Sequence, residues 1–520
     1  MALNTPATGG PLLHPSAHAA LTPDKPAWIM AATGEVVTYG SLDETSNRFA
    51  RLLRARGLGV GTGLVVLLPN HRDLLHVYWG AQRAGLYFTP ISIQFHPQEI
   101  GYVLGDCDAS VFVTCASQLA SLAGLDRELL AIPHRFLLDG SDPRFDDWQT
   151  ALADQPATPL ADDCEGADML YSSGTTGHPK GVRNSTPGSP PGTVSNLFRR
   201  RLDWHLMDDS TVYLSCAPLY HSAPLRYSTM TMRVGGTAVI LHRFDAEQAL
   251  AMIERYRVTH SQWVPTMFVR LLRLEESVRQ RYDLASHRFA VHAAAPCPVP
   301  VKEQMIAWWG PMLYEYYSGT EGNGQTAISP DEWLRHKGSV GRAIHGVLHI
   351  LRDDGSECAP GETGKVYFEN GSDFAYYKDP DKTAQARNAQ GWSTLGDIGH
   401  VDAEGYLYLT DRASFMIISG GVNIYPQEVE NVLAAHPSVM DVAVFGIPDE
   451  EFGEQVKAAV ELAPGRAPDT ALAEELLKWC RARLAHLKCP KSIDFHAALP
   501  RHDTGKLYKQ LLRDAYWPPR

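Results

Sequence analysis

The sequence is poor in cysteine and lacks any cysteine pattern that would predict a disulfide framework or a zinc site. Its eight cysteines include no C-x-x-C pair, and none stands at a zinc-type spacing from histidine. They are typical of reduced, small apolar residues in a reducing cytosol. We therefore expect a cytoplasmic protein.

Clustered positive charge and long apolar runs are also missing. The formal net charge is -12, and nucleic acid attracts proteins with basic patches, so we expect no nucleic-acid partner. The most apolar stretches, such as residues 64–68, are far shorter than the ~20 residues that span a bilayer. Residues 1–15 have no basic cluster followed by an apolar run, as an export signal would. We expect small molecules as partners and no stable membrane anchoring.

Short β-branched runs alternate with amphipathic stretches along most of the chain. The runs lie at residues 64–68, 87–91, 110–114, 211–216, 237–241, 258–264 and 289–294, and the helical stretches at 71–84 and 246–256. Such alternation is typical of parallel sheets with crossover helices. It predicts the α/β class, with a large N-terminal α/β body that can be subdivided further.

The pattern changes beyond residue 411. Pro426 stands where a helix would begin, and strands are expected at 442–445 and 457–462. A second helix is expected from a stripe at i, i+4 spacing, formed by Leu472, Leu476, Cys480, Leu484 and Leu487. These elements predict a compact α+β unit of about a hundred residues.

Residues 171–181, YSSGTTGHPKG, combine four serines and threonines, three glycines and a lysine. Glycines let backbone N–H groups converge and the other side chains add donors, so this stretch predicts a loop that wraps an anion. A P-loop does not fit, because Pro179 and Gly181 stand where its second Gly and its Ser/Thr belong when counted from Gly174. A Rossmann G-x-G-x-x-G does not fit either.

The order S-G-T-T-G-x-P-K-G resembles the signature loop of adenylate-forming enzymes, the superfamily of acyl-CoA synthetases, luciferases and peptide-synthetase adenylation domains. Other segments resemble the family's remaining motifs and extend the resemblance from Tyr39 to Lys506. They are residues 38–42 (TYGSL), 317–321 (YSGTE), 396–399 (GDIG), 402–407 (DAEGYL), 411–412 (DR), 417–430 and 499–506 (LPRHDTGK). Ser318, Leu395 and Phe415 depart from the residues that are usual there.

The resemblance implies an ATP-dependent enzyme that joins a carboxylic acid to coenzyme A. The carboxylate attacks the α-phosphate of ATP, pyrophosphate leaves, and the acyl-adenylate then passes its acyl group to the CoA thiol. It also implies an N-terminal adenylate-forming domain at residues 1–411, a hinge at 412–416 and a mobile C-terminal domain at 417–520 that rotates between the two half-reactions.

The resemblance assigns roles to particular residues. Tyr317 would stack on adenine, Asp397 and Arg412 would bind the ribose, Glu321 would hold Mg²⁺, and Lys506 would bind developing negative charge. The expected catalytic residues are Lys180, His221, Thr320, Glu321 and Lys506. The residues expected to contact ATP or CoA are Ser172, Ser173, Gly174, Thr175, Thr176, Gly177, Lys180, Ala294, Ala295, Pro296, Tyr317, Ser318, Gly319, Thr320, Asp397, Arg412, Gly420 and Gly421.

The acid pocket is also expected from the resemblance, because Tyr220-His221 is similar to the family's aromatic–histidine gate. The expected substrate residues are Tyr220, His221, Trp263, Val264 and Gly324. No basic or acidic residue stands out in the segments around them, and Gly322 and Gly324 would widen the pocket floor. We therefore expect a hydrophobic carboxylic acid, either a fatty acid or a bulky alicyclic acid of the steroid type.

Three alternatives stay open at this point. The acid could be aromatic, of the coumarate or benzoate type. The enzyme could form only the acyl-adenylate and pass it to a separate carrier protein. In a different class, the chain could be an inactive nucleotide-binding module, which intact Lys180, Glu321, Asp397, Arg412 and Lys506 disfavour. The sequence does not decide between a monomer and a homodimer.

Overall fold

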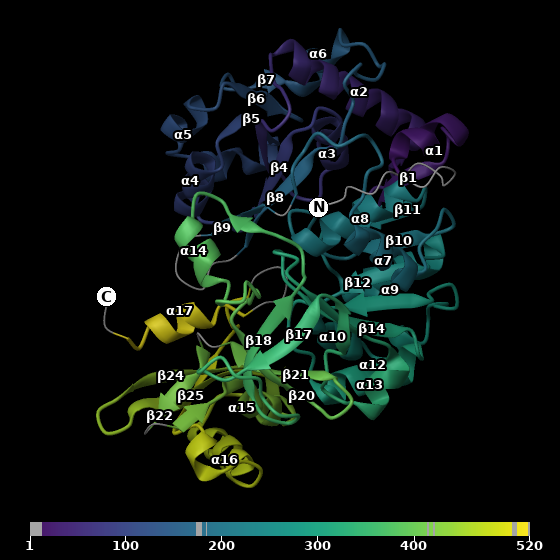
Figure 1. Ribbon diagram of the computed structural model, residues 1–520. Coiled ribbons are helices and arrows are strands. Elements are labelled where there is room, and N and C mark those ends of the chain that lie inside the picture. The colour runs from purple at the N-terminus through teal and green to yellow at the C-terminus, as the bar shows by residue number, and fades with distance from the viewer. Residues whose placement is uncertain are drawn as a thin grey trace.

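The computed structural model describes residues 13–172, 179–183, 185–412, 415–419, 422–501 and 507–517. Figure 1 shows a large N-terminal body and a smaller C-terminal part below it. The expected α/β class is confirmed, with mixed sheets covered by helices. None of the described helices is long and apolar enough to cross a membrane.

The first large sheet is built around β3, whose five residues are all buried. Strands β3 to β8 pair in parallel, while β9 and β19 add an antiparallel edge. In the described residues its order is β19-β9-β8-β4-β3-β5-β6-β7. The strands are β3 (Gly63–Leu67), β4 (Tyr87–Ile91), β5 (Ala109–Thr114), β6 (His134–Leu137), β7 (Asp146–Asp147), β8 (Ala167–Ser172), β9 (Lys180–Arg183) and β19 (Ala375–Tyr376).

The second large sheet has the order β16-β15-β14-β13-β12-β10-β11-β1-β2 within the described part of the chain. Its six inner strands are parallel, β2 pairs antiparallel at one edge, and β15 and β16 add two antiparallel pairings at the other. The strands are β1 (Pro26–Met30), β2 (Val36–Thr38), β10 (Val212–Ser215), β11 (Thr237–Ile240), β12 (His260–Trp263), β13 (Phe289–His292), β14 (Leu313–Ser318), β15 (Gln325–Ile328) and β16 (Arg342–His345).

Helices connect and cover these strands. The amphipathic stretch predicted at residues 246–256 is helix α9, which begins after Asp245 because that carboxylate accepts the backbone N–H of Gln248. The helices of the large body are α1 (Pro15–Leu21), α2 (Tyr39–Ala55), α3 (Leu74–Arg83), α4 (Pro97–Asp106), α5 (Asp126–Leu130), α6 (Trp148–Ala153), α7 (Asn196–His205), α8 (Ser222–Arg233), α9 (Ala246–Tyr256), α10 (Pro265–Leu272), α11 (Glu276–Arg279), α12 (Val299–Trp309), α13 (Pro330–Arg335) and α14 (Pro380–Gln385).

A third, antiparallel sheet was not predicted from the sequence. It has the order β17-β18-β20-β21 and lies at the centre of Figure 1, between the large sheets and the C-terminal part. Its strands are β17 (Val347–Leu351), β18 (Gly364–Glu369), β20 (Asp397–Val401) and β21 (Leu407–Arg412). Because β20 and β21 begin and end with residues of two expected motifs, this sheet brings those motifs together.

The C-terminal part is an α+β unit, as expected. The predicted helix at Pro426 is α15, and the predicted strands lie within the longer β24 and β25. Its elements are β22 (Ile417–Ser419), β23 (Val422–Ile424), α15 (Pro426–Ala434), β24 (Val439–Asp449), β25 (Gly453–Leu462), α16 (Thr470–Arg481), a 3-10 turn (His486–Lys488), β26 (Ser492–His496) and α17 (Lys509–Asp514).

The predicted stripe of the second C-terminal helix is wrong at its end. Helix α16 stops at Arg481, so Leu484 and Leu487 lie beyond it, and Leu487 is 43% exposed. Leu472, Leu476 and Cys480 are buried as expected. The chain leaves the helix early because β26 has to return to pair with β25, and that long-range pairing overrides the local leucine spacing.

Candidate active site

Two of the residues predicted to hold adenosine meet at the end of β14. The hydroxyl of Tyr317 donates to Oδ2 of Asp397 at 2.6 Å. Asp397 is the first residue of β20, is 6% exposed, and stands opposite Arg412 in the register of β20 and β21. Three separate motifs therefore meet here: the ring of Tyr317, the carboxylate of Asp397 and the backbone of Arg412. The roles themselves stay predictions.

Gly319 lies in the turn after β14, close to the ends of two side chains. A Cβ atom there would lie 2.7 Å from Oε2 of Glu321 and 2.7 Å from Cδ1 of Leu395, both closer than a real contact allows. Leu395 is the residue that departs from the family pattern, and it packs directly against the 317–321 segment. Glu321 is 8% exposed, so the turn holds its carboxylate in a nearly dry setting.

A tyrosine that sequence reasoning missed links Lys180 to Glu321. The hydroxyl of Tyr376 donates to Oε1 of Glu321 at 2.9 Å, and Nζ of Lys180 lies 5.1 Å from the centre of the Tyr376 ring. Tyr376 belongs to the two-residue strand β19, which pairs with β9, the strand that Lys180 begins. So short a strand has no periodicity, and no motif marked Tyr376 in the sequence.

Several predicted residues lie outside the described part of the chain. They are Ser173, Gly174, Thr175, Thr176 and Gly177 of the anion loop, Gly420 and Gly421, and Lys506. The residues beside them are described: Ser172 and Lys180 stand opposite each other in β8 and β9, and Ser419 and Val422 stand opposite each other in β22 and β23. The anion loop thus starts and ends at one edge of the first large sheet, next to Tyr376.

The segment predicted to border adenine follows β13 and contains a strained backbone position. Ala294 has φ +75°, a conformation in which Cβ is crowded and which glycine adopts readily. Ala294 therefore holds a backbone conformation that is typical of glycine. Helix α12 follows this segment in the chain. Its buried residue Lys302 forms an ion pair through Nζ with Glu315 of β14 at 2.5 Å, which links the helix to the strand.

The predicted gate residues lie together at the start of α8. The rings of Tyr220 and His221 are 4.6 Å apart at 63°, and Tyr220 is buried. His221 is the residue directly before the helix. This placement agrees with a position in the wall of the predicted acid pocket. The gate function of the two residues stays a prediction.

Two predicted substrate residues are instead part of the hydrophobic core. Trp263 is completely buried among Phe244, Phe268 and Trp309, and its indole N–H donates to Ser261. Val264 is buried in the same cluster. Alternation along β12 turns Trp263 into the layer of α9, α10 and α12, because successive residues of a strand face opposite sides.

Gly324 does not widen a pocket floor either. A Cβ atom at this residue would lie 2.1 Å from the ring of Phe368, so the space beside Gly324 is already filled. The glycine is required for the close approach of Phe368.

Two arginines that sequence analysis did not single out lie near residues of the predicted acid pocket. The Nε–H of Arg201, on α7, donates to Oε1 of Gln325, the residue after Gly324, at 2.9 Å. Nε of Arg226, five residues after His221, lies 3.8 Å from Oδ2 of Asp168. Sequence analysis missed Arg201 because α7 is far along the chain from every motif used.

Glu321 suits the magnesium role predicted for it. Mg²⁺ prefers oxygen ligands and is usually held by one or two carboxylates together with substrate phosphates, so a single carboxylate next to an anion loop is an appropriate donor set. Oε1 of Glu321 is oriented by the Tyr376 hydroxyl.

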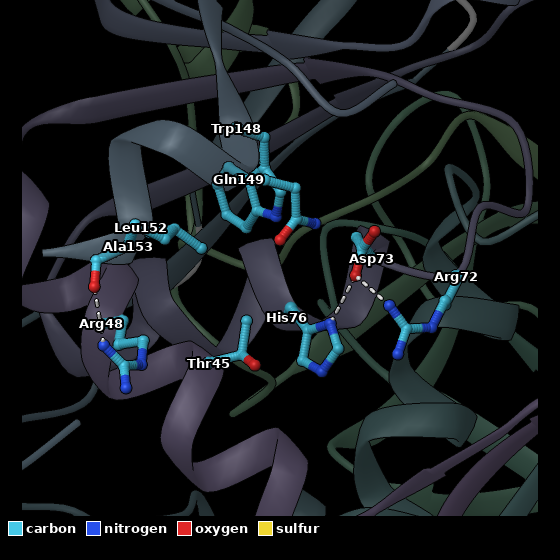
Figure 2. A pocket seen from close by; sticks show the side chains of 9 residues that line it. All are labelled: Thr45, Arg48, Arg72, Asp73, His76, Trp148, Gln149, Leu152 and Ala153. Atoms are coloured by element: carbon cyan, nitrogen blue, oxygen red, sulfur yellow. Dashed lines mark hydrogen bonds and ion pairs between the residues drawn. The ribbon is translucent and has the colours of Figure 1, made fainter. Parts of the chain in front are cut away.

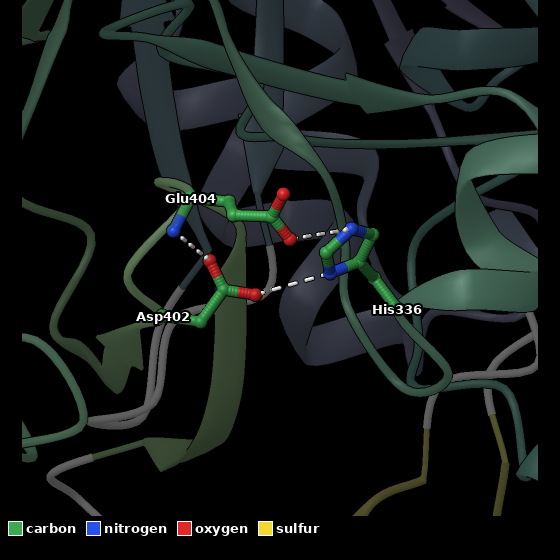
Figure 3. Close-up of side chains that lie close together, drawn as sticks. All are labelled: His336, Asp402 and Glu404. Atoms are coloured by element: carbon green, nitrogen blue, oxygen red, sulfur yellow. Dashed lines mark hydrogen bonds and ion pairs between the residues drawn. The ribbon is translucent and has the colours of Figure 1, made fainter.

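One other group of side chains in the described residues has the spacing of a metal site: His336, Asp402 and Glu404. Figure 3 shows that the two carboxylates face different ring nitrogens, Nδ1 at 3.1 Å from Asp402 and Nε2 at 3.3 Å from Glu404. Both ring nitrogens of His336 are thus already engaged by carboxylates of the protein. These contacts hold the turn between β20 and β21 in place. They therefore help to fix the positions of the two strands that carry Asp397 and Arg412.

A hollow of about 440 Å³ lies between α2, α3 and α6, and none of the predicted site residues lines it. At its centre (Figure 2) is His76, whose Nδ1 is 2.8 Å from Oδ1 of Asp73. Burial lowers the pKa of His76, although Asp73 opposes the shift, so the ring is neutral and donates to the carboxylate. The hollow is separate from the residues described above.

Comparisons with known proteins agree with the geometry. The family model "AMP-binding enzyme" matches residues 16–377, and "AMP-binding enzyme C-terminal domain" matches residues 428–506. The long-chain-fatty-acid–CoA ligase FadD13 of Mycobacterium tuberculosis is 32% identical over 517 residues, which are 96% of this chain and 97% of that protein. Feruloyl-CoA synthase of an Amycolatopsis species is 32% identical over 494 residues, which are 92% of this chain and 94% of that protein.

A solved structure is similar over nearly the whole chain. The o-succinylbenzoate CoA synthetase of Bacillus subtilis, in complex with its acyl-adenylate intermediate, matches with a TM-score of 0.80 and 27% sequence identity. The match covers 98% of this chain and 99% of that chain.

Proposed function

The chain belongs to the AMP-binding enzyme family of AMP-forming acid–thiol ligases, and we propose that it is an acyl-CoA synthetase that works in two steps. In the first step, an oxygen of the acid's carboxylate attacks the α-phosphate of ATP, and the bond from that phosphorus to the bridging oxygen of pyrophosphate breaks. In the second step, the thiol of CoA attacks the acyl carbon, the C–O bond to AMP breaks, and the thiol proton is lost to solvent.

The first step brings together two anions, so the residues mainly have to position and neutralise charge. Tyr317, Asp397 and Arg412 would fix the adenosine, and Lys180 would hold the departing pyrophosphate. Glu321, oriented by Tyr376, would hold Mg²⁺, which when bound supplies positive charge to the phosphate oxygens. Lys506 would act on the charge that develops as the acyl-adenylate forms. No protein nucleophile takes part in this scheme.

One observation carries the proposal. Four segments of the chain meet in two groups of contacts. In the first group Tyr317 contacts Asp397, and in the second Tyr376 contacts both Glu321 and Lys180. The short segment 317–321 belongs to both groups and joins them. A nucleotide could therefore contact an adenosine site and a phosphate site a few residues apart. An inactive nucleotide-binding module would have no need to keep both the phosphate cation and the metal carboxylate.

The acid is a finer part of the proposal. Relatives of comparable similarity are named for long-chain fatty acids and for feruloyl groups, so an aromatic acid remains a candidate beside a fatty or bulky alicyclic one. Tyr220 is buried, and Leu219 and Leu225 close to it in the chain belong to a hydrophobic core cluster, which supports an acid with an apolar body. We further propose a cytoplasmic enzyme, which the eight free cysteines support.

The test is pyrophosphate release and thioester formation with aliphatic, aromatic and steroidal acids, each with and without CoA. The proposal expects acid-dependent pyrophosphate release and an acyl-CoA product with at least one class. Release with every acid but no thioester, and acyl transfer only when a carrier protein is added, would favour the acyl-adenylate alternative. No acid-dependent release with any class would contradict the enzyme assignment.

A further inference from the structure

The side of the β14–β15 hairpin that faces α7 and α8 carries a positive charge that the proposed chemistry does not use. Arg201, on α7, reaches Gln325 on β15 with its Nε–H. Gln325 stands opposite Ser318 in the hairpin register, and Ser318 is the neighbour of Tyr317. The guanidinium is therefore attached to the same hairpin that carries the nucleotide site, on the residue next to Gly324.

Arg201 has no carboxylate partner among the residues that the structure describes. The groups that act on it electrostatically are the hydroxyls of Tyr316 and Tyr227 and the second guanidinium, Arg226. Burial also raises the pKa of both tyrosines, so neither supplies a negative charge. Arg226 has its own partner in Asp168 on β8. This corner of the molecule thus keeps one uncompensated positive charge.

Arg201 is shielded from bulk water yet still accessible. Desolvation is the main cause of a lowered pKa for Arg201, although its side chain keeps part of its accessible surface. Arg226 and Asp168 likewise keep 25% and 15% of their side-chain surface. These exposed fractions show that solvent still reaches the side chains of this cluster. Burial, followed by the charges of Arg200 and Arg201, lowers the pKa of His345, the register partner of Gln325.

A buried guanidinium without an anion is costly, because its hydration is lost and nothing replaces it. Such a group is well suited to a ligand that brings the missing negative charge, and guanidinium binds carboxylate and sulfonate-like oxygens through two parallel N–H donors. The Nε–H of Arg201 donates to Gln325, and within the described part of the chain the terminal N–H groups of Arg201 make no hydrogen bond to a carboxylate.

We propose that Arg201 is a specificity residue that binds a second anionic group on the acid, at the end opposite the reacting carboxylate. The preferred substrates are then acids with an apolar body that end in a carboxylate or a sulfonate. This inference rests on the proposed acyl-CoA synthetase function and replaces the expectation of a purely hydrophobic acid. Gln325 acts as the positioning residue, because it fixes the direction of the guanidinium.

The experiment compares three acids of equal chain length, at six, eight, ten and twelve carbons: the α,ω-diacid, its monomethyl ester and the plain monoacid. Initial rates of acyl-CoA formation are measured with saturating ATP and CoA at pH 7.5. At the best length, the wild-type protein should prefer the diacid to the ester in kcat/KM by about ten- to a hundredfold, the range expected for hydrogen bonds to a charged group.

Arg201→Gln should remove this preference by raising KM for the diacid, while kcat/KM for the ester and the monoacid stays within about twofold. Arg200→Gln is the matched control, because Arg200 is the neighbouring residue on α7 and its Nη1 only donates to the backbone oxygen of Ile344 at the surface. This variant should keep the preference. Thermal unfolding of each variant checks that the fold is intact.

The outcomes separate the two proposals. Equal use of the three acids by the wild-type protein would overturn the role of Arg201 and leave the synthetase function standing. An equal loss for all acids in Arg201→Gln, or a raised KM for CoA with every acid, would also overturn it, because the guanidinium would then bind the reacting carboxylate or a CoA phosphate. Absence of acyl-CoA and of acid-dependent pyrophosphate release with the whole panel would contradict both.

Discussion

At the scale of single residues, the backbone of Ala294 holds a conformation that its side chain does not favour. Its φ of +75° costs an alanine about 1 kcal/mol or more relative to glycine, and the position follows a buried strand whose direction fixes it. Strain of this kind persists where the surrounding structure determines the backbone. It lies here in the segment expected to border adenine.

We predict that Ala294→Gly stabilises the protein by about 0.5–1 kcal/mol, because relief of the strain exceeds the added flexibility of the unfolded chain. Denaturant unfolding of the N-terminal domain would measure the change. Ala293→Gly, at the buried neighbouring residue with no positive φ, is the control and should destabilise. A loss of stability in Ala294→Gly would show that the alanine methyl contributes more packing than strain.

Buried histidines make stability depend on pH. Burial lowers the pKa of His205 and of His287 to about 3 from the ordinary 6.5. Below pH 6.5 the unfolded chain takes up protons at these residues and the folded chain does not, so stability is complete above pH 6.5 and is lost progressively as the pH falls toward 3.

We predict that each of these two histidines lowers the free energy of unfolding by about 2 kcal/mol between pH 7 and pH 5. Urea unfolding at both pH values measures the loss in the wild-type protein and in His287→Asn. The variant should lose about 2 kcal/mol less than the wild type over this interval. An identical pH dependence in the two proteins would mean that His287 does not stay neutral in the fold.

At the scale of elements, the two-residue strand β19 has a larger role than its length suggests. It pairs with β9 and so places Tyr376 between Lys180 and Glu321. If the Tyr376 hydroxyl orients the carboxylate that holds Mg²⁺, removal of that hydroxyl should weaken the use of MgATP more than the use of the acid.

We predict that Tyr376→Phe raises KM for MgATP about tenfold, as expected for loss of a hydrogen bond to a charged group, and leaves KM for the acid within about twofold. Steady-state kinetics at varied Mg²⁺ provides the measurement. Tyr377→Phe is the matched control, because the hydroxyl of this neighbouring tyrosine donates to Asp108 at the surface. Equal effects of the two variants would argue against a specific role for Tyr376.

Sequence reasoning located the elements whose signal is local. Helix α9 was predicted to the residue from its amphipathic pattern, and β4 from its short strand-like run between helical stretches. Sequence reasoning failed where pairing between distant segments determines the structure. Helix α16 ends before Leu484 because β26 has to pair with β25. The antiparallel sheet of β17, β18, β20 and β21 was missed because no periodic pattern in the sequence marks it.

The site shows the same division. Tyr317, Glu321, Asp397 and Lys180 could be found because they lie in motifs with fixed order, and the fold brings them together. Tyr376 and Arg201 could not be found, because each reaches its partner through a contact between segments far apart in sequence. Trp263 was misplaced because an apolar residue beside a motif can face the core or the pocket, and only the strand's orientation decides.

At the scale of the whole molecule, the hinge predicted at residues 412–416 would join two domains that the proposed chemistry requires to move. Phe415 replaces the polar residue that is usual at the hinge, and Nζ of Lys509 on α17 lies 5.6 Å from the centre of its ring. Lys509 also pairs with Glu430 on α15 at 2.8 Å. Phe415 thus lies against residues of the predicted C-terminal domain and is expected to move with it.

If the C-terminal domain presents Lys506 only during the first half-reaction, Lys506→Ala should slow adenylation about a hundredfold or more and change thioester formation from a supplied acyl-adenylate by less than about threefold. Single-turnover kinetics of the two half-reactions separates the effects. A similar loss in both half-reactions would contradict the division of labour between the two faces of this domain.

The most direct test of the account is acid-dependent exchange of labelled pyrophosphate into ATP in the absence of CoA. The account predicts exchange in the wild-type protein with an accepted acid, and at least a hundredfold less exchange in Glu321→Gln. Exchange that requires CoA, or that proceeds unchanged without the carboxylate of Glu321, would contradict the claim that these distant segments form one adenylate-forming site.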